Sequence, residues 1–396
     1  MPNLDLRDPI RLLEELVRID SRTPGELDRP VPAGAATEAA LAAALGEALA
    51  AAGFATELQE AAPGRPNLLA WLGEVKPERP TLLFEAHLDT VGTEGMTGPA
   101  LAPEIRDGRL YGRGACDTKG SLAAMLCALV RLRTERLPLN LAFLGACAEE
   151  TGCEGVQRAE LGRLGRELHI VVGEPTQNRP VAGHKTHIWF ELETRGRAAH
   201  GSVPEQGENA IYRMAAVLRE LQGYAAGPLR GLAPCPAGFT PPTLSVGVIR
   251  GGVKENIVPD RCAIQVDGRL LPAQAPDSFL PALVAELGRR AGYELRVNWS
   301  RLARGMQTPA GSRLLPALLA AAGAVTGRPV AAGIVNYCTD GGHLAHLGHD
   351  TVVFGPGDIG QAHSAVEWLE LGQLREAVEI LVAAARGLAG RGGAGE

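Results

Sequence analysis

Thr81-Leu-Leu-Phe-Glu-Ala-His-Leu-Asp-Thr90 joins a short apolar run to two polar side chains, His87 and Asp89. The apolar run over 82–84 predicts a buried strand, and side chains two residues apart leave the same face of an extended strand, roughly 6–7 Å from each other. Imidazole is a ligand for zinc-like metals, and a neighbouring carboxylate either binds the metal or orients the histidine. This stretch therefore marks a strand end as a candidate metal site.

Strands and helices alternate on both sides of this stretch. Further strands are expected at 54–60, 67–72, 140–145, 169–172 and 351–354, and helices at 9–17, 37–52, 120–132, 314–326 and 374–388. Glu149, Glu150 and Glu174 follow strand ends, as His87 does. Ligands of open α/β sheets bind beyond the carboxyl ends of the strands. We predict an α/β catalytic domain with a mostly parallel sheet and its site at that edge.

The pattern changes near residue 184. Strands at 187–194, 243–249, 262–270 and 295–299 and helices at 209–222 and 277–292 give the order β-α-β-β-α-β. This order predicts a ferredoxin-like, two-layer module. We expect an inserted domain over 184–300 between the two parts of a catalytic domain, 1–183 and 301–396. The Gly- and Ala-rich tail, 389–396, is expected to be disordered.

Composition excludes several classes of function. The 396 residues carry a formal charge of −6 and 45% hydrophobic residues, so no basic excess points to nucleic acid or to an anionic membrane. No apolar stretch approaches the ~18–20 residues of a membrane span, and the start lacks a signal pattern, so we expect a cytoplasmic protein. The seven cysteines form no C-x-x-C pair, which argues against a disulfide framework or a Cys-rich zinc site.

The chemistry-bearing residues match a pair of metal ions bridged by one carboxylate. Such a centre needs about five protein ligands, and the candidates are His87, Asp117, Glu150, Glu174 and His363. Asp117 follows the glycines of Tyr111-Gly-Arg-Gly114, which allow the backbone to pass close to the site, so we assign it as the bridge. Carboxylates of adjacent residues diverge on an extended segment, so Glu150 can bind metal while Glu149 acts as general base toward a water molecule.

Three rival chemistries fit less well. Gly112 and Gly114 with Lys119-Gly120-Ser121 lack the spacing of a phosphate-binding loop. A Gly-x-Ser-x-Gly nucleophile elbow is missing from the sequence. Cys116 is better interpreted as a small buried residue than as a nucleophile.

Five motifs together carry a family resemblance: His87-Leu-Asp89, Gly112-Arg-Gly-Ala-Cys-Asp117-Thr-Lys-Gly120, Glu149-Glu150-Thr-Gly152, Gly173-Glu174-Pro-Thr176 and Gln361-Ala-His363. Over nearly its whole length the chain resembles the zinc-dependent amidohydrolase and exopeptidase family. That family contains acetylornithine deacetylase, succinyl-diaminopimelate desuccinylase, aminoacylases and glutamate carboxypeptidases. The resemblance implies a metal-dependent hydrolase of linear amides.

The resemblance also implies a role for individual residues. His87 and Glu174 would bind one Zn²⁺, and Glu150 and His363 the other, with Asp117 between them, Asp89 behind His87 and Glu149 as the base. Co²⁺ or Mn²⁺ also suits such a carboxylate-rich set.

Further implications concern the inserted domain. His200 would donate to the oxyanion in the partner subunit's site, which implies a homodimer through that domain. Asn256 and Arg269 would hold polar groups of the substrate, and Arg suits a carboxylate.

Within the family, three segments are most similar to acetylornithine deacetylase: 184–187, 335–340 and 354–363. The expected substrate is therefore a small N-acyl amino acid, N-acetylornithine first, which would place the enzyme in arginine biosynthesis. The alternatives are a succinyl-diaminopimelate desuccinylase, a broader aminoacylase or dipeptidase, and a catalytically inactive metal-binding homologue. Segment 94–101 departs from the usual family sequence and bears on substrate choice.

Overall fold

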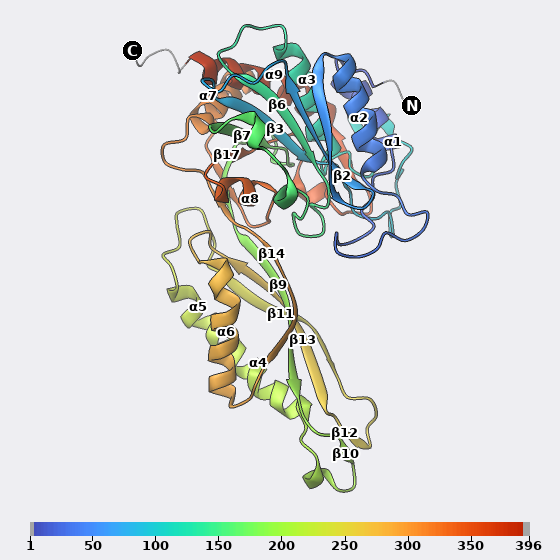
Figure 1. The fold of residues 1–396 in the computed structure, drawn as a ribbon, viewed down its shortest axis with the longest axis vertical. Helices are drawn as coiled ribbons and strands as arrows, with labels where there is room; N and C mark the ends of the chain where they lie inside the picture. Colours follow the sequence, from blue (N-terminus) through green and yellow to red (C-terminus); the bar gives the residue numbers. More distant parts are fainter. Residues whose placement is uncertain (1–3, 391–396) are drawn as a thin grey trace. The chain divides into compact units, whose positions relative to one another are not determined.

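A computed structural model describes residues 4–390. They form two compact units, each visible in Figure 1: the first unit is the chain up to Gly183, Gln307–Ile334 and the chain from Thr339 on, and the second is His184–Met306 with Val335–Cys338. The second unit extends past residue 300, where we expected its end. The reason is that β14 (Arg296–Ala303) pairs with β9 (Thr186–Arg195) as far as His187.

A mostly parallel sheet forms the centre of the first unit. Its order is β1 (Phe54–Ala62), β2 (Arg65–Leu72), β6 (Asn140–Ala146), β3 (Thr81–His87), β7 (Leu168–Val172), β17 (Asp350–Val353) and β8 (Val181–His184). The neighbours β6, β3, β7 and β17 are parallel, and β1, β2 and β8 add antiparallel flanks. The short strands β15 (Met306–Gln307) and β16 (Gly333–Val335) belong to the same sheet. This sheet confirms the predicted fold class.

Helices of the first unit cover this sheet, and all but the shortest of them share one apolar core. They are α1 (Pro9–Arg18), α2 (Ala39–Ala51), α3 (Lys119–Leu132), α7 (Leu314–Thr326), α8 (Gly341–His346) and α9 (Leu371–Gly390). Asp8 caps α1 by accepting from the N–H groups of Ile10 and Arg11. In α3 only Arg131 is not buried, which confirms the predicted interior helix. Helix α3 lies between the sheet and α9 (Figure 1). No helix within 4–390 is long and apolar enough to cross a membrane.

The chain end and one small sheet differ from expectation. Residues 389 and 390 were expected to be disordered but end α9, and 391–396 lie outside the described residues. A three-stranded antiparallel sheet, β18 (Trp368–Glu370), β5 (Arg109–Tyr111) and β4 (Glu104–Arg106), was not predicted. Its strands have three residues each, too few for a periodic pattern. Through the pairing of β5 with β18, this sheet brings the segment just before Gly112 next to the segment that follows His363.

The second unit has the predicted β-α-β-β-α-β order. Its sheet has the order β11 (Thr243–Gly251), β13 (Arg261–Leu270), β9 and β14, all antiparallel. Helices α4 (Ala210–Ala226) and α6 (Pro276–Ala291) cover one face, with α5 (Pro228–Gly231) beside them (Figure 1). Ile188, Phe190 and Leu192 alternate along β9 and join the helix-side core. The small strands β10 (Ala199–His200) and β12 (Ile257–Val258) pair with each other.

Candidate metal centre

The expected metal ligands gather where neighbouring parallel strands end. His87 is the last residue of β3, Glu150 follows β6 by four positions, and Glu174 follows β7 by two. Strands β6, β3 and β7 are adjacent and parallel, so their carboxyl ends meet at one edge of the sheet. His87 and Glu174 are almost fully buried.

Asp117 lies between two histidines. Its Oδ1 is 3.1 Å from Nε2 of His87, and its Oδ2 is 3.4 Å from Nε2 of His363. Two oxygens of one carboxylate therefore face two different imidazoles. This is the arrangement that a carboxylate shared by two cations requires, so the residues present fit a two-metal centre.

Glu150 completes the half of the site that contains His363. Nε2 of His363 lies 3.0 Å from Oε2 of Glu150. Donor atoms of His87, Asp117 and Glu150 all lie within 4.8 Å of one another, so these three could hold a single ion. Glu174 and His363 are outside that group of three, and the assignment of all five residues as ligands stays a prediction.

Acidic side chains outnumber basic ones in the site. Burial raises the pKa of Glu149 and of Glu174 well above the ordinary value, and it raises the pKa of Glu150 to about 7 with further help from the Asp117 carboxylate. Hydrogen bonds with Asp117 and Glu150 raise the pKa of His363 to about 10. The acidic groups hold protons because they are buried close to one another, so their negative charges repel. Bound cations would reduce the same repulsion.

Asp89 contacts both sides of the site and is fully buried. Its Oδ1 accepts a hydrogen bond from the backbone N–H of Glu149 and its Oδ2 one from that of Glu150, each at 3.1 Å. Nδ1 of His87 hydrogen-bonds to the backbone carbonyl oxygen of Asp89 at 2.9 Å and lies 3.5 Å from its Oδ1, while Nε2 of His87 faces the site. Asp89 thus orients a histidine and holds the turn that carries two glutamates.

The sequence matches peptidase family M20/M25/M40 over residues 83–387. The chain belongs to this family. The acetylornithine deacetylase of Myxococcus xanthus is 35% identical over 85% of this chain and 88% of its own length. That of Aliivibrio fischeri is 30% identical over 83% and 86%. These relatives indicate that this M20 protein is a hydrolase.

Solved structures share the fold at lower identity. The M20 family metallo-carboxypeptidase Sso-CP2 of Sulfolobus solfataricus has a TM-score of 0.76 at 19% identity, covering 96% of this chain and 99% of its own. A Bacillus subtilis protein described as a dinuclear metal binding peptidase from the M20 family has a TM-score of 0.67 at 15% identity, covering 95% and 96%. Both support the fold class.

Glu367 is a site residue of this M20 chain that sequence analysis missed. Its buried carboxylate accepts hydrogen bonds from the backbone N–H groups of Gly114 (3.0 Å), Cys116 (2.9 Å) and Asp117 (3.0 Å). It also pairs with Arg113 at 2.6 Å. Strand β18 begins at the next residue and pairs with β5, which places Glu367 beside the Asp117 loop. A glutamate before a three-residue strand carries no local signal of that role.

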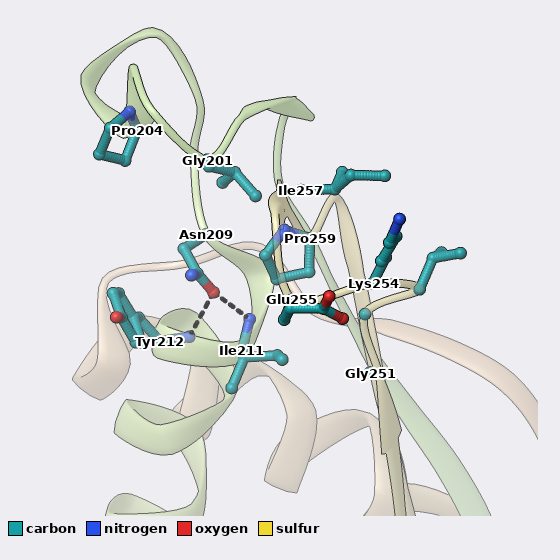
Figure 2. A pocket seen from close by; sticks show the side chains of 13 residues that line it. Gly201, Pro204, Asn209, Ile211, Tyr212, Gly251, Lys254, Glu255, Ile257 and Pro259 are labelled. Carbon is teal, nitrogen blue, oxygen red and sulfur yellow. Dashed lines mark hydrogen bonds between the residues drawn. The ribbon is translucent and has the colours of Figure 1, made fainter.

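His200, predicted to assist catalysis, and Asn256, predicted to hold the substrate, lie in the second unit of the M20 chain. His200 is exposed on β10, and its Nδ1 lies 2.7 Å from Oγ of Ser202. The backbone carbonyl of Asn256 accepts from the N–H of Gly201 at 2.8 Å, so His200 and Asn256 are held in one small region. The adjoining hollow has a volume of about 640 Å³. Its lining residues include Tyr212, Lys254 and Ile257 (Figure 2).

Arg269 lies on β13 of the second unit and already has a partner. Its Nε and Nη2 donate to the two oxygens of Asp267 at 2.8 and 3.0 Å. Trp189 Nε1 donates to the same carboxylate at 2.9 Å. A substrate carboxylate at Arg269 would therefore compete with Asp267, a feature that the sequence did not reveal.

Proposed function

We propose that this M20 hydrolase removes the N-acyl group of a small N-acyl amino acid, with N-acetylornithine as the first candidate. The observation that carries the proposal is the Asp117 carboxylate, whose oxygens face His87 and His363 from opposite halves of the site. The names of the two deacetylase relatives support the choice of acyl group and amino acid. The place in arginine biosynthesis and the cytoplasmic location stay predictions.

His87, Asp117, Glu150, Glu174 and His363 would hold two divalent ions, Zn²⁺ first and Co²⁺ or Mn²⁺ as substitutes. When bound, such ions polarise a scissile carbonyl and lower the pKa of a water molecule. Glu149 accepts the proton of the attacking water and passes it to the leaving amine. Its burial supports this role, because burial raises the pKa of Glu149 and makes its carboxylate a stronger base than an exposed one. Asp89 keeps His87 oriented throughout.

We further propose a homodimer formed through the second unit, with His200 acting in the partner's site. Apolar side chains gather around the hollow of Figure 2: Tyr212 is 75% exposed, Val253 90% and Ile257 40%. Exposed apolar patches mark interaction surfaces. Strand β11 also ends the sheet order, so its backbone is open to pairing with another chain. Asn256 and Arg269 are the proposed substrate contacts.

The test is a substrate comparison on metal-analysed protein. N-acetylornithine, N-succinyl-diaminopimelate, other N-acyl amino acids and dipeptides are assayed after loading with Zn²⁺ or Co²⁺. Glu149→Ala is expected to abolish turnover while retaining two metal ions per chain. Preference for the succinyl substrate or for dipeptides would replace the proposed substrate by one of the alternatives. Failure of the wild-type protein to hydrolyse any of them with full metal content would indicate an inactive homologue.

A further inference from the structure

The turn after β6 has an unusual set of backbone contacts. Four consecutive peptide N–H groups each donate to a side-chain oxygen rather than to a backbone carbonyl. Cys147 N–H donates to Asn67 at 3.0 Å, Ala148 N–H to Glu38 at 3.2 Å, and the next two N–H groups to Asp89 at 3.1 Å each. The three acceptors come from different parts of the first unit. The path of the turn is therefore fixed by side chains distant in sequence.

The acceptor of Ala148 belongs to a buried ion pair. Glu38 is 0% exposed and Arg65 1%. Arg65 Nε donates to Oε2 of Glu38 at 3.0 Å, and Nη2 contacts Oε1, the oxygen that also receives the Ala148 N–H. Arg65 further donates to the carbonyl of Gly25 and to Oγ1 of Thr23. Each charged group of the pair is thus held by several hydrogen bonds.

Ala148 needs such support. Its φ is 56°, in the left-handed region that residues with a Cβ seldom adopt. A residue in this conformation persists only where its surroundings enforce it. Because Glu149 is the next residue, the conformation of Ala148 sets the direction in which the Glu149 side chain leaves the turn.

We propose that the Glu38–Arg65 ion pair is a positioning element that directs Glu149 toward the site by holding the Ala148 amide. The inference rests on the proposed role of Glu149 as general base. It assigns a function to Glu38 and Arg65, which lie outside the five sequence motifs of the site. Neither residue reaches the reacting atoms through the contacts described, so both are positioning residues. Their effect is exerted through the turn alone.

A purely stabilising role gives a different expectation. Replacing both members of a buried ion pair by apolar side chains of similar volume often preserves stability, because no unpaired charge is left behind. The double variant Glu38→Leu/Arg65→Met should therefore fold, yet it leaves the Ala148 N–H without its acceptor. Glu38→Gln is the conservative companion, since its amide oxygen can still accept from Ala148.

The experiment measures kcat, KM, metal content and amide hydrogen exchange for these variants and for Leu49→Ala. Leu49 is a buried residue of α2, so its variant loses core packing without touching the turn. In the double variant we expect kcat to fall about 10- to 100-fold, as for a displaced catalytic group. KM and metal content should change less than about threefold, and peptides covering 145–155 should exchange faster. Glu38→Gln, if folded, should retain more kcat than the double variant, and Leu49→Ala should keep the wild-type kcat.

The outcomes separate the two proposals. Wild-type kcat and unchanged exchange over 145–155 in a folded double variant would overturn the positioning role while leaving the proposed function intact. Activity in Glu149→Ala would instead remove the base on which the inference rests. Faster exchange over 145–155 is measured without substrate and supports the hold on the turn independently of any turnover. Should the double variant not fold, Glu38→Gln and Glu38→Leu are compared in the same exchange assay. Both leave Arg65 without its counter-charge, but only Glu38→Leu removes the acceptor of the Ala148 N–H, so equal protection in both would contradict the proposal.

Discussion

Oδ2 of Asp89 accepts a hydrogen bond from the backbone N–H of Glu150 at 3.1 Å, although the residues are 61 positions apart. The other oxygen of Asp89 binds the N–H of Glu149 and approaches His87. One carboxylate thus joins the end of β3 to the turn after β6. A candidate metal ligand, its orienting group and the proposed base form one connected structure.

Asp89→Asn tests this connection. The amide keeps one acceptor oxygen, but its NH₂ group faces an N–H that needs an acceptor, so the turn that carries Glu149 and Glu150 loses its fixed orientation. The backbone carbonyl of residue 89 still binds His87. We expect metal affinity to fall about 10- to 100-fold, the usual cost of losing a group that orients a ligand. Competition with a chromophoric chelator measures it. Asp107→Asn, in an exposed turn, is the matched control, and equal affinities in the two variants would refute the assigned role.

Glu367→Gln tests the support of Asp117. The substitution leaves the buried Arg113 without its counter-charge, and losing one partner of such a pair costs about 3–5 kcal/mol of unfolding free energy. Metal content should fall as well, because the loop carrying Asp117 loosens. Urea unfolding and metal analysis are the measurements. Glu370→Gln breaks the partly exposed pair between Glu370, at the end of β18, and Arg109 of β5, so a loss of no more than about 1 kcal/mol is expected there. Similar losses in both variants would contradict the prediction.

Mixed dimers test whether His200 acts across subunits. Glu149→Ala and His200→Ala proteins, each inactive alone, are unfolded, mixed in equal amounts and refolded. If His200 serves the partner's site, each heterodimer regains one complete site, and activity should return to about a quarter of wild type by random pairing. No recovery would show that His200 acts within its own chain or not at all.

Light scattering is run in parallel on wild type and Tyr212→Asp, and the latter is expected to dissociate to the 41.5 kDa monomer.

Gly155→Ala tests the close packing beneath the acidic turn. A Cβ at this position would lie 2.0 Å from the carbonyl oxygen of Cys147, a backbone atom that cannot rotate away. Overpacking of this kind typically costs about 1–3 kcal/mol, and the shifted turn should lower kcat as well. A Cβ at Gly162 meets nothing within 4 Å, so Gly162→Ala should remain close to wild type in both measurements. Wild-type stability for Gly155→Ala would show that the turn can move freely.

Asp350→Asn gives a pH-dependent loss of stability. Burial alone would raise the pKa of Asp350, but hydrogen bonds from His169 and from the start of α7 outweigh it and leave the pKa below its ordinary value. A lowered folded-state pKa contributes stability above the unfolded pKa of about 3.9, and that stability is lost as the pH falls further. Urea unfolding at pH 7 should show a loss of about 1.5–3 kcal/mol for the variant. The difference from wild type should shrink below pH 4, and a constant difference would contradict the assignment.

Periodicity and motif position predicted much of the molecule. The buried run at 82–84, the interior helix at 120–132 and the order of elements in the second unit follow from local patterns that survive folding. The placement of His87, Glu150 and Glu174 could also be predicted, since parallel strands bring their carboxyl ends to one edge. The small sheet of β4, β5 and β18 could not, because its strands are short and distant in sequence.

What the sequence alone determined was the type of chemistry: a strand ending in His87-Leu-Asp89 and carboxylates after two more strands specify a candidate metal site at one edge of the sheet. Tertiary structure decided which groups hold that edge in place. Glu38 and Arg65 reach the turn after β6, and Glu367 reaches the Asp117 loop, through contacts between segments remote in the chain. The sequence around a single buried glutamate has no periodicity or spacing that predicts its partner. The partner depends on how the whole sheet packs and not on the neighbouring residues in sequence.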